Sequence, residues 1–352
     1  MPRRAEAGAG LFRLLVVKTH DTGFKHRTGP VKGAAARVTG TLFSRSIHLP
    51  GFTFTRRAGV AVLASAALLL SAAAWPASLL VLQSDFGSKD AAVASMKGVA
   101  VGVSPQLAIY DLTHEIPAFN IWEASLRLAQ TAAYWPRGTV FVSVVDPGVG
   151  TERKSVVLKT RTGHYFVSPD NGTLTAVAEQ LGIEAVRAID EAVNRRANSE
   201  KSYTFHGRDV YAYTGARLAA GVISFAEVGP ELPAEVMMIP YQKPRYEKGR
   251  VYGNIEILDP QYGNVWTNID RATFARLQLQ PGDRINIRIS HAGVVVLQQT
   301  LPYFPTFGQV AVGDTLLYLN SQNKVALAIN EGNFADTYHI SSGASWNIEI
   351  VK

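Results

Sequence analysis

Three places in the sequence carry polar side chains that could bind or activate a small molecule. Asp85 and Asp146 each follow an apolar run, and His206 opens the motif His206-Gly207-Arg208-Asp209 just ahead of a helix-like stretch. An Asp beside Gly or Pro is also a common turn former, and a histidine in a loop often has no catalytic role. Taken singly, each residue therefore leaves an ordinary turn or loop role open.

The spacing after Asp146 is more informative. The segment from Asp146 to Arg153 reads DPGVGTER, so two glycines and a proline separate an acid from a base. A loop of this composition can fold back and bring the carboxylate and the guanidinium together, which would fix the orientation of the acid. An isolated arginine would instead be expected in solvent.

These side chains need a scaffold that brings strand ends together. Short apolar runs at 79–82 and 139–145 predict strands that are buried on both faces of a parallel sheet. Ligands of open α/β sheets bind beyond the carboxyl ends of the strands, so Asp85 and Asp146 are expected at one edge. The other elements predicted here are helices at 90–103, 120–134, 174–181 and 210–220 and strands at 107–111, 155–159 and 164–167.

The pattern changes after Gly229-Pro230. A proline-containing segment with little periodicity indicates a linker, and beyond it apolar and polar residues alternate at 251–257, 284–289 and 346–350. The predicted fold class is α/β: an N-terminal α/β domain with a mostly parallel sheet between helices, followed by a smaller all-β, barrel-like domain. The expected boundaries are 79–232 for the α/β domain, 233–249 for the linker and 250–352 for the β domain.

The first 78 residues have the character of a leader. Residues 58–75 read AGVAVLASAALLLSAAAW, without a charge and directly after Arg56-Arg57. A basic flank, an apolar core and small residues make up a secretory signal peptide, although this length is also near the lower limit for a membrane anchor. We expect a leader at 1–55 that is disordered or not translated, and a signal peptide or anchor at 56–78. The protein is then exported, periplasmic or secreted, or else anchored, with membrane contact only through 58–75.

Charge and cysteine content exclude several classes. The chain carries 35 Lys and Arg against 28 Asp and Glu, and its net charge of +7 would suit nucleic-acid binding. Residues 1–78 hold 11 of the basic and 2 of the acidic side chains, which leaves 24 basic and 26 acidic side chains in the rest of the chain. The folded part is therefore not basic, and we expect no nucleic-acid partner. With no cysteine, the chain has no disulfides, thiolate nucleophiles, iron–sulfur clusters or cysteine zinc sites.

One enzyme family carries several of these motifs in the same order. They are Ser84-Asp85-Phe86-Gly87, Val144-Val145-Asp146-Pro147-Gly148-Val149-Gly150-Thr151 with Arg153, Ser168-Pro169-Asp170-Asn171-Gly172, His206-Gly207-Arg208-Asp209 and Gly263-Asn264-Val265-Trp266-Thr267-Asn268-Ile269. On these residues the chain, from Leu79 to its C-terminus, resembles the S-adenosyl-L-methionine (SAM) hydrolases, also called SAM hydroxide adenosyltransferases. That family is related to the SAM-dependent fluorinases and chlorinases.

The resemblance implies hydrolysis of SAM to adenosine and L-methionine, by attack of an activated water or hydroxide on ribose C5′. It implies catalytic roles for Asp146, Arg153 and His206. Asp146 is the favoured proton acceptor, but the division of labour between Asp146 and His206 stays open. We expect no cofactor and no metal, because SAM is the substrate.

The resemblance also implies the substrate-binding residues and the assembly. Asp85 would grip the ribose hydroxyls and Phe119 would lie beside the ribose. The residues expected to hold the methionine and adenine parts are Asp259, Asn264, Ser321, Asn330 and Glu331. Phe304 or Phe307 could stack on adenine, with core packing as the alternative. Family members form trimers with SAM between the N-terminal domain of one subunit and the C-terminal domain of the next, so a homotrimer is implied.

Some positions depart from the family pattern. Ala92 and Asn120 replace side chains common in relatives, and Gln322 stands where halogenases carry an arginine, which bears on the carboxylate contact. Asp146 stands where halogenases have a tyrosine, and Gly207 where they have a halide-contacting hydroxyl, which favours water as the nucleophile. The alternatives are a protein that binds adenosine or SAM without turnover and a SAM-dependent halogenase.

Overall fold

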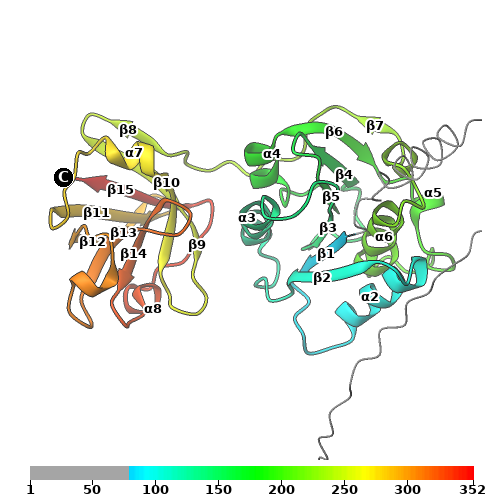
Figure 1. Ribbon diagram of the computed structural model, residues 1–352, viewed down its shortest axis with the longest axis horizontal. Helices are drawn as coiled ribbons and strands as arrows, with labels where there is room; N and C mark the ends of the chain where they lie inside the picture. The colour runs from blue at the N-terminus through cyan, green and yellow to red at the C-terminus, as the bar shows by residue number, and fades with distance from the viewer. Residues whose placement is uncertain (1–78) are drawn as a thin grey trace, which may run out of the picture. The chain divides into compact units, whose positions relative to one another are not determined.

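The computed structural model describes residues 79–352 (Figure 1). The expected leader at 1–55 and the expected signal peptide or anchor at 56–78 lie outside the described residues. Among the helices that are described, none is long and apolar enough to cross a membrane.

The first half of the described chain is an α/β domain, as predicted. The strands described in its sheet are β1 (Leu79–Ser84), β2 (Ala108–Thr113), β3 (Val140–Val144), β4 (Ser155–Thr160), β5 (Tyr165–Pro169), β6 (Ile183–Ala188) and β7 (Glu231–Leu232). The helices are α2 (Ala92–Val103), α3 (Ile121–Ala132), α4 (Thr175–Leu181), α5 (Glu191–Asn194), the π-helix η1 (Gly207–Ala212) with α6 (Tyr213–Ala219), and the 3₁₀ turn η2 (Phe225–Val228).

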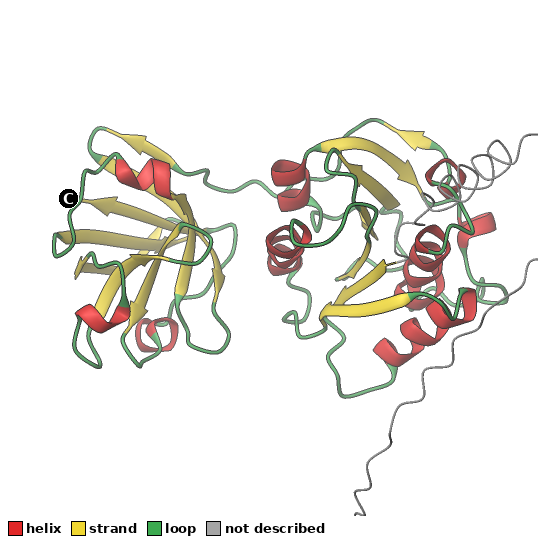
Figure 2. Ribbon diagram, viewed as in Figure 1, coloured by secondary structure: helices red, strands yellow, loops and turns green. Residues whose placement is uncertain are grey.

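Strand β1 shows why the sheet needs helices on both faces. Leu80 and Leu82 pack in the core cluster that holds α2 and α6, whereas Val81 packs in the cluster that holds α3 and α4. Successive side chains of a strand point to opposite faces, so an uninterrupted apolar strand must be covered twice. The two helix pairs lie on opposite sides of the sheet (Figures 1 and 2).

The sheet is mixed. Its strand order is β2-β1-β3-β5-β4-β6-β7, and β2, β1, β3 and β5 pair in parallel, while β4, β6 and β7 join them antiparallel. The predicted parallel arrangement therefore holds for the half of the sheet that ends in the candidate residues. The chain passes from β4 to β5 by a short turn, as antiparallel neighbours allow, and it reaches β6 from β5 through α4.

The predicted helix at 210–220 begins earlier and in an unexpected form. Residues Gly207–Ala212 form a π-helix that runs directly into α6. A π-turn holds one residue more than an α-turn and is frequent at functional sites. It follows His206 at once, so the irregular turn sets where that side chain points.

The second half of the described chain is a small all-β domain, also as predicted. The strands described are β8 (Arg245–Glu247), β9 (Arg250–Leu258), β10 (Val265–Asp270), β11 (Arg284–His291), β12 (Val294–Pro302), β13 (Thr315–Leu319), β14 (Lys324–Ile329) and β15 (Trp346–Val351). The short helices are α7 (Arg271–Ala275), the 3₁₀ turn η3 (Phe307–Gln309) and α8 (Phe334–Tyr338). Strand β8 lies within the stretch expected as a linker and pairs with β9.

The strands of this domain pair antiparallel in the order β12-β11-β15-β9-β10-β14-β13. A bridge between Tyr303 and Leu317 connects the chain after β12 to β13, so the two ends of the sheet meet. This closure gives the barrel-like form and leaves less unpaired strand edge.

Two helical glycines give a test of the packing between α6 and the sheet. A Cβ on Gly215 would lie 2.4 Å from Cγ2 of Val142, whereas a Cβ on Gly98 in α2 meets nothing within 4 Å. We expect Gly215→Ala to lower the free energy of unfolding by about 1–3 kcal/mol through overpacking. Gly98→Ala should raise it by about 0.5–1 kcal/mol, because alanine loses less backbone entropy than glycine. Urea unfolding measures both, and a gain at both positions would contradict the described packing of α6.

Candidate active site

Two predicted acids lie at one edge of the parallel sheet. Strands β1 and β3 are parallel neighbours in register, with Ser84 opposite Val144, so the residues that follow them emerge at the same edge. There Asp85, Phe119, Asp146 and His206 line one cavity of about 260 Å³. The rest of its lining is largely apolar (Phe86, Ala118, Val144, Val149, Thr204, Phe205 and Gly207). A carboxylate and an imidazole in such surroundings interact more strongly than they would in water.

The predicted pairing of Asp146 with Arg153 is present. Arg153 Nε donates to Asp146 Oδ1 at 2.8 Å and Nη2 donates to Oδ2, so the guanidinium binds the carboxylate through both oxygens. Two successive turns, closed by Val149 N–H to Asp146 O and Thr151 N–H to Gly148 O, reverse the loop between them. Both side chains are buried, with 5% of Asp146 and 11% of Arg153 exposed. The bidentate pair fixes the plane of the acid.

His206 lies between two guanidinium groups. Its Nδ1 is 3.3 Å from Nη2 of Arg153, and its Nε2 is 3.1 Å from Nη2 of Arg195. The pKa of His206 is lowered, mainly because the ring is buried; the charges of Arg153 and Arg195 act in the same direction, and those of Glu191 and Asp146 oppose them. The imidazole is therefore neutral over a wider range toward acid pH than an exposed histidine.

Tyr211 lies behind the ion pair and is not among the site residues predicted from the sequence. Its ring is fully buried, its hydroxyl is 3.1 Å from Ser155 Oγ and 3.5 Å from Asp146 Oδ2, and the Arg153 guanidinium stacks 5.6 Å from its centroid. Burial raises the pKa of Tyr211, so its hydroxyl keeps its proton and can donate. The only sequence signal is an aromatic residue soon after the His-Gly-Arg-Asp motif.

Asp85 and Phe119 form the other side of the cavity. The Phe119 N–H donates to Asp85 Oδ2 at 2.9 Å, and Phe119 adopts a positive φ of 67° with 71% of the residue exposed. A positive φ is uncommon for a bulky side chain and points to a functional constraint more than to packing. The other carboxylate oxygen of Asp85 has no hydrogen-bond partner among the described residues and could accept a hydrogen bond from a ligand.

Gly207 allows the backbone to pass close to the cavity wall. A Cβ at this position would lie 3.0 Å from Cζ of Phe86 and 3.1 Å from Cγ1 of Val144. Phe86 itself packs edge-on against Phe205, with centroids 5.8 Å apart. A larger residue at 207 would therefore displace the aromatic wall.

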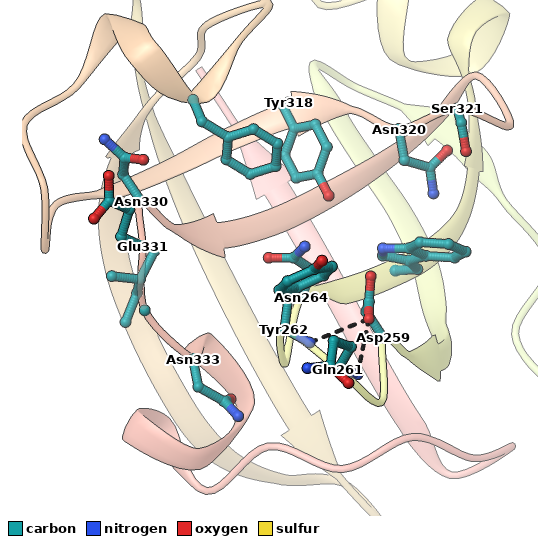
Figure 3. A pocket seen from close by; sticks show the side chains of 14 residues that line it. Asp259, Gln261, Tyr262, Asn264, Tyr318, Asn320, Ser321, Asn330, Glu331 and Asn333 are labelled. Carbon is teal, nitrogen blue, oxygen red and sulfur yellow. Dashed lines mark hydrogen bonds between the residues drawn. The ribbon is translucent and has the colours of Figure 1, made fainter. Parts of the chain in front are cut away.

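The five residues predicted in the second half of the chain line one pocket of the β domain (Figure 3). This pocket has a volume of about 830 Å³ and contains Asp259, Asn264, Ser321, Asn330 and Glu331. Phe307 also lines it, beside Tyr318 at a centroid distance of 4.8 Å, whereas Phe304 packs against the small cluster around Leu316. Of the two phenylalanines considered from the sequence, Phe307 is thus the one at the pocket.

The loop that carries Asp259 has a defined shape. Asp259 Oδ1 accepts from the backbone N–H groups of Gln261 and Tyr262, at 3.0 and 3.2 Å (Figure 3). Gly263 closes the loop with a φ of +67°, and a Cβ there would lie 1.8 Å from Asn333 Oδ1. Only glycine fits this position, which explains the Gly-Asn pair that precedes β10.

Asn320 is a further pocket residue that the sequence did not reveal. Its Oδ1 accepts from the N–H groups of Gln322 and Lys324, which fixes the amide plane. Its Nδ2 is buried and has no hydrogen-bond partner among the described residues. A buried donor without a partner costs free energy, so this amide is suited to an acceptor on a ligand.

Comparison with known proteins identifies relatives for both domains. The family model described as SAM hydroxide adenosyltransferase N-terminal domain matches residues 80–229, and that of the C-terminal domain matches residues 253–347. A protein of Salinispora tropica named (R)-S-adenosyl-L-methionine hydrolase is 33% identical, over 76% of this chain and 96% of its own. One of the same name from Methanocaldococcus jannaschii is 38% identical, over 60% and 74%.

The similarity extends to proteins with a second activity and to a solved structure. A fluorinase of an Actinoplanes species is 29% identical, over 75% of this chain and 95% of its own. The crystal structure of a conserved protein from Thermotoga maritima superposes with a TM-score of 0.70 at 34% identity, over 78% of this chain and the whole of the other.

Proposed function

The chain belongs to the SAM hydroxide adenosyltransferase family, and on that premise we propose that it is a SAM hydrolase that forms adenosine and L-methionine. The observation that carries this proposal is the buried Asp146–Arg153 pair beside His206, in an apolar-lined cavity that also holds Asp85. A site that only bound a nucleoside would not need a buried acid with a fixed plane next to a neutral imidazole.

The reaction transfers the adenosyl group from sulfur to water. The water oxygen forms a bond to ribose C5′ as the C5′–S bond breaks, and the electron pair of that bond converts the sulfonium into the neutral thioether of methionine. The leaving group needs no proton, so the protein has to position the water and accept its proton. Asp146 is our proposed acceptor, Arg153 holds its plane, and His206 contributes a neutral ring nitrogen.

Water is favoured over halide by charge. An anionic nucleophile must lose its hydration shell, which is costly beside a carboxylate. Asp146 supplies such a carboxylate at the cavity, and Gly207 offers no side-chain donor for a halide. The similarity to fluorinases therefore reflects common descent, and the two kinds of protein differ in their nucleophile.

The remaining predicted residues receive the rest of the substrate in this proposal. Asp85 accepts from the two ribose hydroxyls, and the exposed ring of Phe119 lies against the sugar. In the β-domain pocket, Asp259 and Asn264 take the methionine ammonium and the adenine edge, with Ser321, Asn330 and Glu331 completing the contacts. The Asn320 side-chain amide is suited to the substrate carboxylate, since its buried nitrogen has no partner among the described residues.

The nucleophile can be identified from the products. With SAM in ¹⁸O-labelled water and an excess of chloride or fluoride, we expect adenosine that carries the label in its 5′-hydroxyl. Mass spectrometry of the nucleoside product measures this. A 5′-halo-5′-deoxyadenosine as main product would establish halogenation instead, and tight adenosine binding without turnover would establish the binding-protein alternative.

Three substitutions separate chemistry from binding. Asp146→Asn and His206→Ala should each lower kcat by about 10² or more, the scale for loss of a positioned acid–base group, with little change in adenosine affinity. Asp85→Ala should weaken adenosine binding first. Steady-state kinetics and calorimetry with adenosine give the comparison, and equal losses of affinity in all three variants would refute the assignment.

We propose that the working form is a homotrimer with its site between subunits. The support is that the predicted residues line two pockets with separate sets of residues, one from each domain. Asp146→Asn and Asp259→Ala would each be inactive alone, but subunits exchanged between them should regain part of the activity, because some sites would combine two intact halves. Sedimentation gives the oligomeric state, and a monomer or a mixture without recovery would contradict the proposal.

We also propose that the protein is made as a precursor and exported. The support is the order of basic, apolar and small residues at 56–77 and the concentration of positive charge before residue 79. N-terminal mass spectrometry of the protein from its host should find a start near residues 76–79. A chain with its complete N-terminus in the soluble cytoplasmic fraction would exclude export.

A further inference from the structure

We propose that Arg195 is a positioning residue which, together with Arg153, holds His206 as a neutral imidazole beside Asp146. This inference rests on the proposed hydrolase function for its kinetic consequences, but not for its structural basis. Arg195 lies outside the motifs that link the chain to its family, and none of its hydrogen bonds to the described residues reaches Asp146.

Every part of the Arg195 guanidinium has a partner. Nε pairs with Glu191 Oε2 at 3.1 Å, Nη1 donates to the Ser202 carbonyl at 3.4 Å, and Nη2 lies 3.1 Å from His206 Nε2. The group also stacks on the Tyr203 ring at 5.7 Å, and 8% of the side chain is exposed. A guanidinium fixed on this many sides cannot swing away from the histidine without losing several contacts.

The neighbouring arginine fixes the backbone from which Arg195 extends. The Arg196 N–H donates to the Asp209 carbonyl at 2.8 Å, and Arg196 Nε donates to the Asp209 carboxylate at 2.9 Å. Arg195 and Arg196 thus hold the two ends of the His206-to-Asp209 segment, one through the imidazole and the other through the buried acid. The two side chains are adjacent in sequence but serve different partners.

The geometry at His206 determines which protonation state fits. A guanidinium has hydrogen-bond donors only, and each of the two ring nitrogens of His206 faces a different guanidinium group. A neutral imidazole can accept a hydrogen bond at one nitrogen, whereas an imidazolium would present N–H groups to N–H groups on both sides. The two arginines therefore disfavour the charged ring through hydrogen bonding as well as through charge.

The charged groups with the largest effect on the ring come from more than one element. Asp146 and Arg153 come from the loop after β3, Glu191 and Arg195 come from α5 and its C-terminus, and Asp85 lines the same cavity. Burial and the two arginines lower the pKa of His206, and Glu191 and Asp146 oppose them. Loss of the Arg195 charge should consequently raise the pKa of His206, and loss of the Glu191 charge should lower it.

The expected functional consequence is activity that persists on the acid side of neutrality. A reaction that needs neutral His206 fails only when the ring takes up a proton, and a lowered pKa moves that failure to lower pH. Arg195 thereby extends the working range and orients the ring, without touching the reacting atoms.

Four variants of the purified protein separate charge from geometry. Arg195→Gln removes the charge, and the acid limb of the kcat profile should move to higher pH by about one pH unit. Arg195→Lys keeps the positive charge but loses the planar guanidinium. The acid limb of the kcat profile should therefore stay at the same pH, while kcat falls on the order of tenfold. Glu191→Gln should move the limb in the opposite direction from Arg195→Gln. Lys201→Gln is the matched control, since it removes a positive charge from the same loop at an exposed side chain that has no described contact with His206.

NMR titration of the His206 ring gives a readout that does not depend on turnover. The resonance is assigned by its absence in His206→Gln, and its midpoint should rise in Arg195→Gln and stay unchanged in Lys201→Gln. The proposal is overturned if folded Arg195→Gln titrates like the wild type, or if Lys201→Gln shifts the midpoint of His206 as much as Arg195→Gln does. A protein that fails to hydrolyse SAM yet shows the expected midpoints would refute the proposed function and leave this inference standing.

Discussion

The buried ion pair of Asp146 and Arg153 is the constraint on which the rest of the N-terminal site depends. A carboxylate removed from water needs compensation for each oxygen, and here Arg153 binds both, with the Tyr211 hydroxyl close to one. Ser155 Oγ accepts a further hydrogen bond from Nη1 of the same guanidinium, at 3.1 Å. This one charge pair thereby holds together the loop after β3, the start of β4 and the π-helix. It also determines the position of the His206 ring.

Much of this arrangement could be predicted because it follows from local composition. The apolar runs that became β1 and β3 require a sheet covered on both faces, and parallel strands bring Asp85 and Asp146 to one edge. The glycines between Asp146 and Arg153 permit the reversal that pairs them. In the β domain, the alternation of apolar and polar residues predicted an all-β fold, and the motif around Asn264 predicted some of the residues that line its pocket.

The rest depends on contacts between residues far apart in sequence. Nothing in the segment 155–169 distinguishes a strand that pairs parallel from one that pairs antiparallel, so the mixed sheet could not be derived from it. Arg195 and Tyr211 acquire their roles only when α5 and the π-helix pack against the loop after β3. Asn320 looks like an ordinary turn residue until its side-chain amide nitrogen is found to have no partner among the described residues.

The π-helix after His206 also affects which changes of chain length this site can tolerate. An α-helix turns by about 100° per residue, and the π-turn accommodates one residue beyond that repeat. Deletion of a single residue between Gly207 and Ala212 would let the helix continue as a regular α-helix into α6, but it would displace buried residues of this segment, among them Val210 and Ala212. It would also rotate Tyr211 or His206 away from the ion pair. The segment can therefore diverge by substitution far more readily than by insertion or deletion, and its length is a better marker of a retained site in distant relatives than its composition.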